Sequence, residues 1–260
     1  MMTTASSQRR EALDAAGYLN LGTLLTPDEV VVYREIYDRF LNGSIDTGDK
    51  RSDLGSGTGT APACGAPENI TQIMWPSVLC PELLDLPLHS RALTLARELV
   101  GEDMVLDFDM LIDKAPRTAV PTPWHQDAGY WVDLPDKRAV SIWVSLDHAT
   151  LDNGCIWYVH GSHMTPLRPH WPAGKGGGAI ECECSEDEPG ATPVPLAPGE
   201  AAAHAGHTLH YSRGNTTDAH RRAYILNYRS SAMIQLERER GMDHGLNDNV
   251  RLVRNTAASS

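Results

Sequence analysis

The chain has 260 residues, 41% of them hydrophobic and 22% charged, which is typical of a globular protein with one sizeable core. Its formal net charge of −12 argues against binding to nucleic acid or to an anionic membrane surface. The sequence shows no membrane-length apolar run and no secretory signal, and its five cysteines lack a framework spacing, so we expect a cytoplasmic protein with reduced thiols.

Helical patterns dominate residues 8–101. Thr26 and Glu29 have the spacing of a capping box, and Pro27 occupies the first helical position between them. The helical period then continues to Asn42. We therefore expect a long helix here, as part of an N-terminal helical buttress.

A second helix is expected to begin at Ser90, a residue that can cap it, and to end at Gly101. Between the two helices, residues 43–69 are rich in Gly, Ser, Thr, Asp and Pro. This composition predicts a long loop, and a loop of that length is usually functional.

Beyond Gly101 the pattern changes to alternating apolar and polar residues, which is typical of β-strands. The alternating segments are 104–112, 139–149, 154–162 and 222–231. Residues 164–200 interrupt them with prolines, glycines and an acidic run, and predict an insert. We expect one mainly β domain over residues 1–260, with a core at 102–230 and a tail at 231–260.

The loop PTPWHQDAGYW, residues 121–131, contains His125 and Asp127. In an extended backbone, residues two apart project to the same face. An imidazole and a carboxylate are two of the three ligands in the facial arrangement used by non-haem iron oxygenases. A second histidine is needed to complete such a site.

The stretch GEAAAHAGHTLHYSRGNTTDAHRRAYILNY, residues 199–228, predicts a hairpin that brings a histidine close to Arg221 or Arg222. A buried guanidinium can hold the far carboxylate of a dicarboxylic acid whose other end chelates a metal. His204 and His207 are interpreted as structural residues rather than ligands.

Three motifs occur in a specific order. They are WHQD at 124–127, NGCIWYVHGSH at 153–163, and HTLHYSRGNTTDAHRRA at 207–223. With Trp143 between the first two, the chain resembles the phytanoyl-CoA dioxygenase family over about residues 12–230. The resemblance implies a double-stranded β-helix, or jelly-roll, and an enzyme that uses Fe(II), 2-oxoglutarate and O2.

The resemblance also implies roles for individual residues. His125, Asp127 and His210 match the iron ligands. Arg221 matches the arginine that binds the far carboxylate of 2-oxoglutarate, and Ser212 matches a hydroxyl that assists it.

Further residues are expected around this centre. Trp143 is expected to line the co-substrate pocket, and Gln72 to add a polar contact from a strand. Arg222 is the alternative to Arg221, because a shift of one residue along a strand exchanges the two faces. The candidate substrate contacts are Tyr130, Trp131 and Gln126; Gln126 is expected to point opposite to the ligands and to help shape the pocket.

By resemblance, the expected reaction is hydroxylation of a small molecule with release of succinate and CO2. Cyclisation, epoxidation and desaturation stay open, as do a zinc-dependent hydrolase and an inactive jelly-roll binding protein. The retained Asp127 disfavours halogenation.

The net charge and the acids at 181–188 disfavour a phosphate-rich acyl-CoA. They favour a neutral or cationic compound, such as an intermediate of bacterial secondary metabolism. The oligomeric state stays open.

Overall fold

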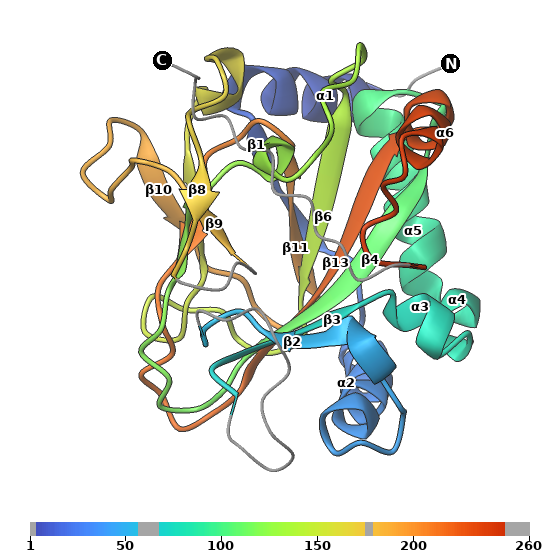
Figure 1. The fold of residues 1–260 in the computed structure, drawn as a ribbon, viewed down its shortest axis with the longest axis vertical. Helices are drawn as coiled ribbons and strands as arrows, with labels where there is room; N and C mark the ends of the chain where they lie inside the picture. The colour runs from blue at the N-terminus through green and yellow to red at the C-terminus, as the bar shows by residue number, and fades with distance from the viewer. Residues whose placement is uncertain (1–3, 57–67, 175–178, 248–260) are drawn as a thin grey trace.

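The computed structural model describes residues 4–56, 68–174 and 179–247. Two antiparallel β-sheets face each other, and helices cover the outer face of the larger sheet (Figure 1). The larger sheet has the strand order β1-β11-β6-β13-β4-β3-β2, and the smaller sheet has the order β10-β7-β12-β5. This arrangement confirms the expected mainly β, jelly-roll fold with helical support.

The larger sheet contains β1 (Tyr18–Thr23), β2 (Arg51–Asp53), β3 (Ile70–Met74), β4 (Met104–Lys114), β6 (Ala139–Ser145), β11 (Glu200–Ala205) and β13 (Arg221–Ser230). The smaller sheet contains β5 (Thr122–His125), β7 (Ile156–Val159), β10 (Ala191–Val194) and β12 (His210–Ser212). A separate pair is formed by β8 (Trp171–Pro172) and β9 (Ile180–Glu181).

The helices are α1 (Thr4–Ala16), α2 (Pro27–Leu41), α3 (Pro76–Leu79), α4 (Glu82–Asp85), α5 (Pro87–Val100) and α6 (Ser231–Glu239). The described residues also form three short 3-10 helices, η1 (Gly48–Lys50), η2 (Asp127–Gly129) and η3 (Ser162–Met164).

Both faces of the larger sheet are buried, as strand β6 shows. Its residues Ile142 and Val144 belong to the hydrophobic cluster that includes the buried faces of α2 and α5. Trp143, which lies between them in the sequence, packs on the opposite face with Ile156 of the smaller sheet. Because successive strand residues point to opposite faces, one continuous apolar segment supplies both cores.

The N-terminal region is less purely helical than expected. Strands β1, β2 and β3 lie within residues 8–101 and form the two edges of the larger sheet. Strand β1 pairs with β11, and β3 pairs with β4. Strand β3 contains Gln72, which was expected to lie on a strand. Strands β1 and β2 are short and form by pairing with other strands, so a local pattern does not reveal them.

The two expected helix starts have different outcomes. The capping box of α2 is confirmed, since Glu29 donates its backbone N–H to the Thr26 side chain and its carboxylate accepts from the Thr26 N–H at 2.8 Å. The expected start of α5 at Ser90 is wrong. The helix begins at Pro87, whose ring fixes a helical φ, and the Ser90 hydroxyl donates to the Pro87 carbonyl inside the first turn.

The expected insert at 164–200 is only partly an insert. Strand β10 lies within it and pairs with β7, so this part belongs to the smaller sheet. The acidic run that follows β9 is not simply solvated, because Glu186 and Glu188 form ion pairs with Arg213 and Arg168. Residues 57–67 and 175–178, inside the two expected loops, and 248–260, inside the expected tail, lie outside the described residues.

Among the described residues, no helix combines the length and the apolar character required to cross a membrane. Four cysteines are described, and all are free: Cys80, Cys155, Cys182 and Cys184.

A buried carboxyl on β4 makes the stability of the fold depend on pH. Asp109 is 0% exposed and accepts hydrogen bonds from the Tyr224 hydroxyl at 2.6 Å and from the Ser77 N–H at 3.2 Å. Burial raises its pKa from 3.8 to about 6. The unfolded chain therefore ionises first, so the stabilising contribution is full below about pH 4 and is lost as the pH rises through 6.

We expect the free energy of unfolding of the wild-type chain, relative to Asp109→Asn, to fall by about 2 kcal/mol between pH 4.5 and 7. Urea unfolding of both chains at several pH values in this range measures the difference. A difference that does not change with pH would contradict the raised pKa of Asp109.

Candidate active site

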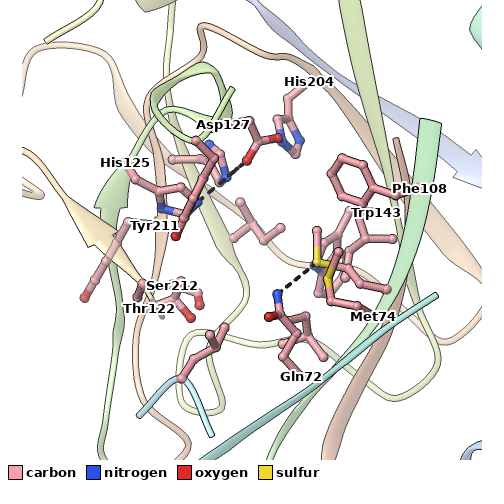
Figure 2. A pocket seen from close by; sticks show the side chains of 18 of the residues that line it. Gln72, Met74, Phe108, Thr122, His125, Asp127, Trp143, His204, Tyr211 and Ser212 are labelled. Atoms are coloured by element: carbon pink, nitrogen blue, oxygen red, sulfur yellow. Dashed lines mark hydrogen bonds and ion pairs between the residues drawn. The ribbon is translucent and has the colours of Figure 1, made fainter. Parts of the chain in front are cut away.

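The three expected metal ligands converge on one pocket between the sheets. His125 ends β5, and His210 begins β12 directly opposite it in the antiparallel register. Asp127 follows at the start of η2, so a turn rather than a continuous strand brings it beside His125. Its Oδ1 lies 3.7 Å from Nε2 of His125 and 3.5 Å from Nε2 of His210 (Figure 2).

Both histidines are held in the tautomer that a metal requires. Nδ1 of His125 lies 2.8 Å from the Pro123 carbonyl, and Nδ1 of His210 lies 2.9 Å from the Thr208 carbonyl. Because a carbonyl oxygen only accepts, each Nδ1 carries the proton. Each Nε2 therefore presents its lone pair towards Asp127 and its partner histidine.

The second oxygen of Asp127 is held by residues of the larger sheet. Oδ2 accepts from the Ser141 hydroxyl at 2.7 Å and lies 3.2 Å from Nε2 of His204. Asn227 donates to Ser141, and the Tyr158 hydroxyl lies 3.2 Å from Nδ1 of His204. These contacts orient the carboxylate so that Oδ1 faces the two ligand histidines.

The protonation states also suit a metal. Burial acts to raise the pKa of Asp127, but the neighbouring imidazoles, His210 first, outweigh it and hold that pKa below its ordinary value. Burial lowers the pKa of His125 and of His210. A carboxylate and two neutral imidazoles are the facial donor set of non-haem Fe(II), so the residues present fit iron.

Removal of the hydrogen bond from Ser141 tests the support of Asp127. We expect Ser141→Ala to lower the affinity for Fe(II) by about 10- to 100-fold, because the carboxylate loses the donor that orients it. Ser145→Ala is the matched control, since this serine of the same strand donates to the Asp147 carbonyl instead. Equal Fe(II) affinity of the two variants in anaerobic titrations would show that Ser141 does not position Asp127.

A buried guanidinium lines the same pocket. Arg221, the first residue of β13, is 2% exposed, and its Cζ lies 5.3 Å from the centre of the Trp143 ring. Burial lowers its pKa, but arginine keeps its charge in proteins. Within the described chain, its Nε and Nη1 have no hydrogen-bond partner. An unpaired buried cation is costly, so this position suits a carboxylate ligand.

The neighbouring arginine does not share this role. The Arg222 guanidinium forms ion pairs with Asp147 at 2.8 Å and with Asp38 at 2.5 Å, on the other side of the sheet from Arg221. It does not line the pocket. Arg221, rather than Arg222, therefore has the position that suits a carboxylate ligand.

The remaining expected site residues fall into two groups. Those that line the pocket are Ser212, Trp143, Gln72, Tyr130 and Trp131. The expectation for Gln126 is wrong: it is 0% exposed and does not line the pocket. Its side chain instead donates to the His207 carbonyl at 2.7 Å and accepts from the Arg168 N–H at 2.9 Å, because it points away from the ligands on either side of it.

The sequence interpretation missed several residues of the site. Ser141 and His204 contact Asp127, although neither is expected to bind a metal. Others line the pocket: Thr122, Tyr211, Met74, Phe108, Met110, Met242 and His244. The alternation of apolar and polar residues along β4 could have indicated that Phe108 and Met110 face the pocket. No local pattern marks Met242 or His244 as pocket residues.

The fold is a jelly-roll, and one of its pockets holds two histidines, one carboxylate and a buried arginine. This combination defines the structural class of the non-haem iron, 2-oxoglutarate oxygenases. Consistent with this class, the family model described as phytanoyl-CoA dioxygenase (PhyH) matches residues 13–223. The chain belongs to this family, which confirms the resemblance found in the sequence.

Individual relatives agree with this assignment. Phytanoyl-CoA dioxygenase domain-containing protein 1 of Bos taurus is 31% identical over 143 residues, 53% of this chain and 49% of that protein. The chain thus spans about half the length of the curated relatives it matches.

Among solved structures, EvdO2 from Micromonospora carbonacea var. aurantiaca, complexed with 2-oxoglutarate, is 30% identical with a TM-score of 0.70, covering 89% of this chain and 93% of that one. The epimerase SnoN, in complex with Fe3+, alpha ketoglutarate and nogalamycin RO, has a TM-score of 0.69 over 98% of this chain and 96% of that one. At 20% identity it supports the fold alone.

Proposed function

We propose that this chain is an Fe(II)- and 2-oxoglutarate-dependent dioxygenase that hydroxylates a small molecule and releases succinate and CO2. The observation that carries the proposal is the buried guanidinium of Arg221, whose Nε and Nη1 have no hydrogen-bond partner among the described residues, in the pocket that also holds His125, Asp127 and His210. When bound at the three ligands, Fe(II) supplies open positions at which a 2-oxo acid and dioxygen react.

The residues of the chain supply binding and orientation. Arg221 is suited to bind the far carboxylate of 2-oxoglutarate, and the hydroxyl residues Ser212 and Thr122 line the same pocket. The ring of Trp143, on the neighbouring strand β6, lies against the guanidinium of Arg221. The 2-oxoglutarate in the structure of EvdO2, which shares the fold, supports this co-substrate.

The substrate proposed here is an uncharged small molecule rather than a CoA thioester. Met74 and Phe108 lie across the pocket from His125 and Asp127 (Figure 2). Met110 packs against them, and Met242 also lines the pocket. Among the described residues of the lining, Arg221 is the single Lys or Arg side chain. Once 2-oxoglutarate occupies it, no Lys or Arg of the described lining is left for the phosphates of CoA. Intermediates of secondary metabolism are suitable compounds to screen.

The test is anaerobic addition of Fe(II) and 2-oxoglutarate, followed by exposure to oxygen with a panel of neutral small molecules. We expect a visible charge-transfer band before oxygen is added, and succinate release that depends on one class of compound. A gain of one oxygen atom in the product identifies hydroxylation or epoxidation, and a loss of two hydrogens identifies desaturation or ring closure. Hydrolysis with Zn(II) but no band with iron would contradict the proposal, as would a band without succinate for any compound.

A further inference from the structure

The chain returns to the pocket after α6. Met242 and His244 line the pocket, and Leu246 packs on the cluster of Met74, Trp75 and Phe108. The Trp75 indole donates to the His244 carbonyl at 3.1 Å. His244 has a φ of +54°, a conformation that non-glycine residues rarely adopt, so the surrounding contacts hold this turn in place.

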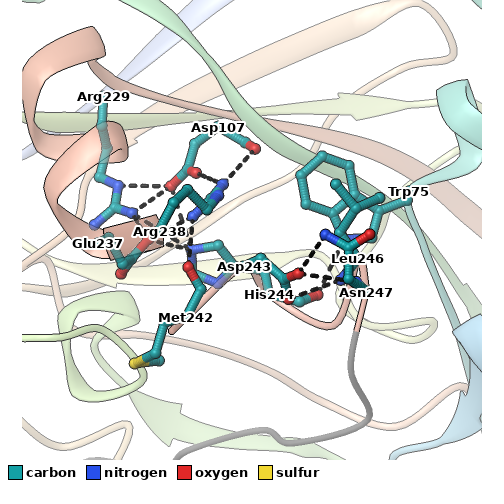
Figure 3. Close-up of polar contacts among 10 residues, drawn as sticks. All are labelled: Trp75, Asp107, Arg229, Glu237, Arg238, Met242, Asp243, His244, Leu246 and Asn247. Carbon is teal, nitrogen blue, oxygen red and sulfur yellow. Dashed lines mark hydrogen bonds and ion pairs between the residues drawn. The ribbon is translucent and has the colours of Figure 1, made fainter. Parts of the chain in front are cut away.

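A buried ionic cluster holds one edge of the His244 ring. Its Nε2 lies 3.0 Å from Oε2 of Glu237 and 3.3 Å from Oδ2 of Asp107, and both carboxylates are fully buried (Figure 3). Arg229 and Arg238 each pair with both acids. Because both acids accept only, Nε2 carries a proton and donates towards them.

This cluster is not suited to a metal ion, although its three potential ligand atoms lie within 4.8 Å of one another. Both carboxylates already pair with the two guanidinium groups. A dication would have to compete with these ion pairs and would lie beside two arginines, which is electrostatically unfavourable. The cluster instead fixes the position of His244.

The other edge of the ring has a different environment. Within the described part of the chain, the polar contacts of the His244 ring, with Glu237, Asp107 and Arg229, are all made by Nε2, and the 8% exposed side chain belongs to the lining of the pocket. The ring packs against Phe108, with ring centres 4.2 Å apart. The two carboxylates at Nε2 outweigh burial and raise the pKa of His244, which favours a proton on Nδ1 as well.

We infer that His244 is a specificity-determining residue whose Nδ1–H binds an acceptor oxygen of the substrate. Its neighbours Phe108, Met74 and Met242 contact the apolar body of that molecule. The preferred substrate class is then an apolar, ring-containing compound that carries a carbonyl or hydroxyl group on the side away from iron. This inference deepens the proposed function and rests on it for the identity of the site.

A matched pair of compounds tests the inference. 1-Tetralone and tetralin share a ring system and differ in one carbonyl oxygen. We expect the wild-type chain to bind the ketone about tenfold more tightly than the hydrocarbon, as for one hydrogen bond from a charged donor. In His244→Phe this ratio is expected to fall to about twofold or less. His148→Phe, which replaces an exposed histidine, serves as the control and keeps the ratio.

Binding is measured by NMR without metal and again with Fe(II) and 2-oxoglutarate under nitrogen. In the wild-type chain, the Nδ1 resonance of His244 is expected to shift with the ketone and not with tetralin, which tests the contact without a variant. Equal affinity for the two compounds, no binding of either, or an unchanged ratio in His244→Phe would overturn the inference. The iron and 2-oxoglutarate band is read separately, so a missing band with a retained ketone preference rejects the proposed function and keeps the binding role of His244.

Discussion

Asp127→Ala is expected to abolish succinate release and to lower Fe(II) affinity by more than the roughly 10- to 100-fold that loss of an outer hydrogen-bond partner produces. Asp127 is the anionic member of the three-ligand set, and its Oδ1 lies within 3.7 Å of both histidines. Its removal leaves two neutral imidazoles, which hold a divalent ion poorly. Anaerobic Fe(II) titration and succinate release measure the two effects.

Asp133→Ala is the control for this change. Asp133 is an exposed acid six residues further along the same loop and pairs with Lys137 at the surface. We expect this variant to bind iron like the wild-type chain. Thermal unfolding of Asp127→Ala without metal shows whether the fold is retained. A folded variant that still binds iron with near wild-type affinity would remove Asp127 from the metal site.

Arg221→Leu is expected to raise the Kd for 2-oxoglutarate by between about 30-fold and several thousandfold. Loss of one partner from a buried, hydrogen-bonded charge pair costs about 2 to 5 kcal/mol. Leucine fills part of the space beside Trp143 and removes a buried cation, so the fold is expected to persist. Titration of the Fe(II)–2-oxoglutarate band under nitrogen measures the affinity.

Arg222→Lys tests whether the loss of any guanidinium on β13 weakens 2-oxoglutarate binding. Its guanidinium is occupied by Asp147 and Asp38 on the other side of the sheet. We therefore expect a small loss of stability and an unchanged Kd for 2-oxoglutarate. If the two variants weakened 2-oxoglutarate binding equally, the assignment of the pocket arginine would be wrong.

The sequence was informative where a short motif carries its own geometry. The pair at 125 and 127, the histidine at 210 and the arginine at 221 could be named because the ordered motifs that contain them resemble a known family. The structure places all four side chains in one pocket. The start of α2 was equally accessible, because a capping box is a local set of hydrogen bonds.

Features that depend on distant partners could not be predicted in this way. Strand β1, near the start of the chain, forms against β11, and Ser90 was displaced from its expected role by Pro87. His244 lies in the turn that follows α6, and its position becomes clear only when Asp107 and Glu237 are brought together. Gln126 was misplaced because its neighbours in the motif, and not its own contacts, suggested a pocket role.

The pairing of His125 with His210 across β5 and β12 has a consequence for how the protein acquires its metal. Neither strand carries the whole donor set, and 85 residues separate the two imidazoles, so an unfolded chain offers no equivalent coordination. Iron is therefore a ligand of the native state alone. By mass action, cellular iron would stabilise the small sheet against opening, and its withdrawal would loosen these two strands first.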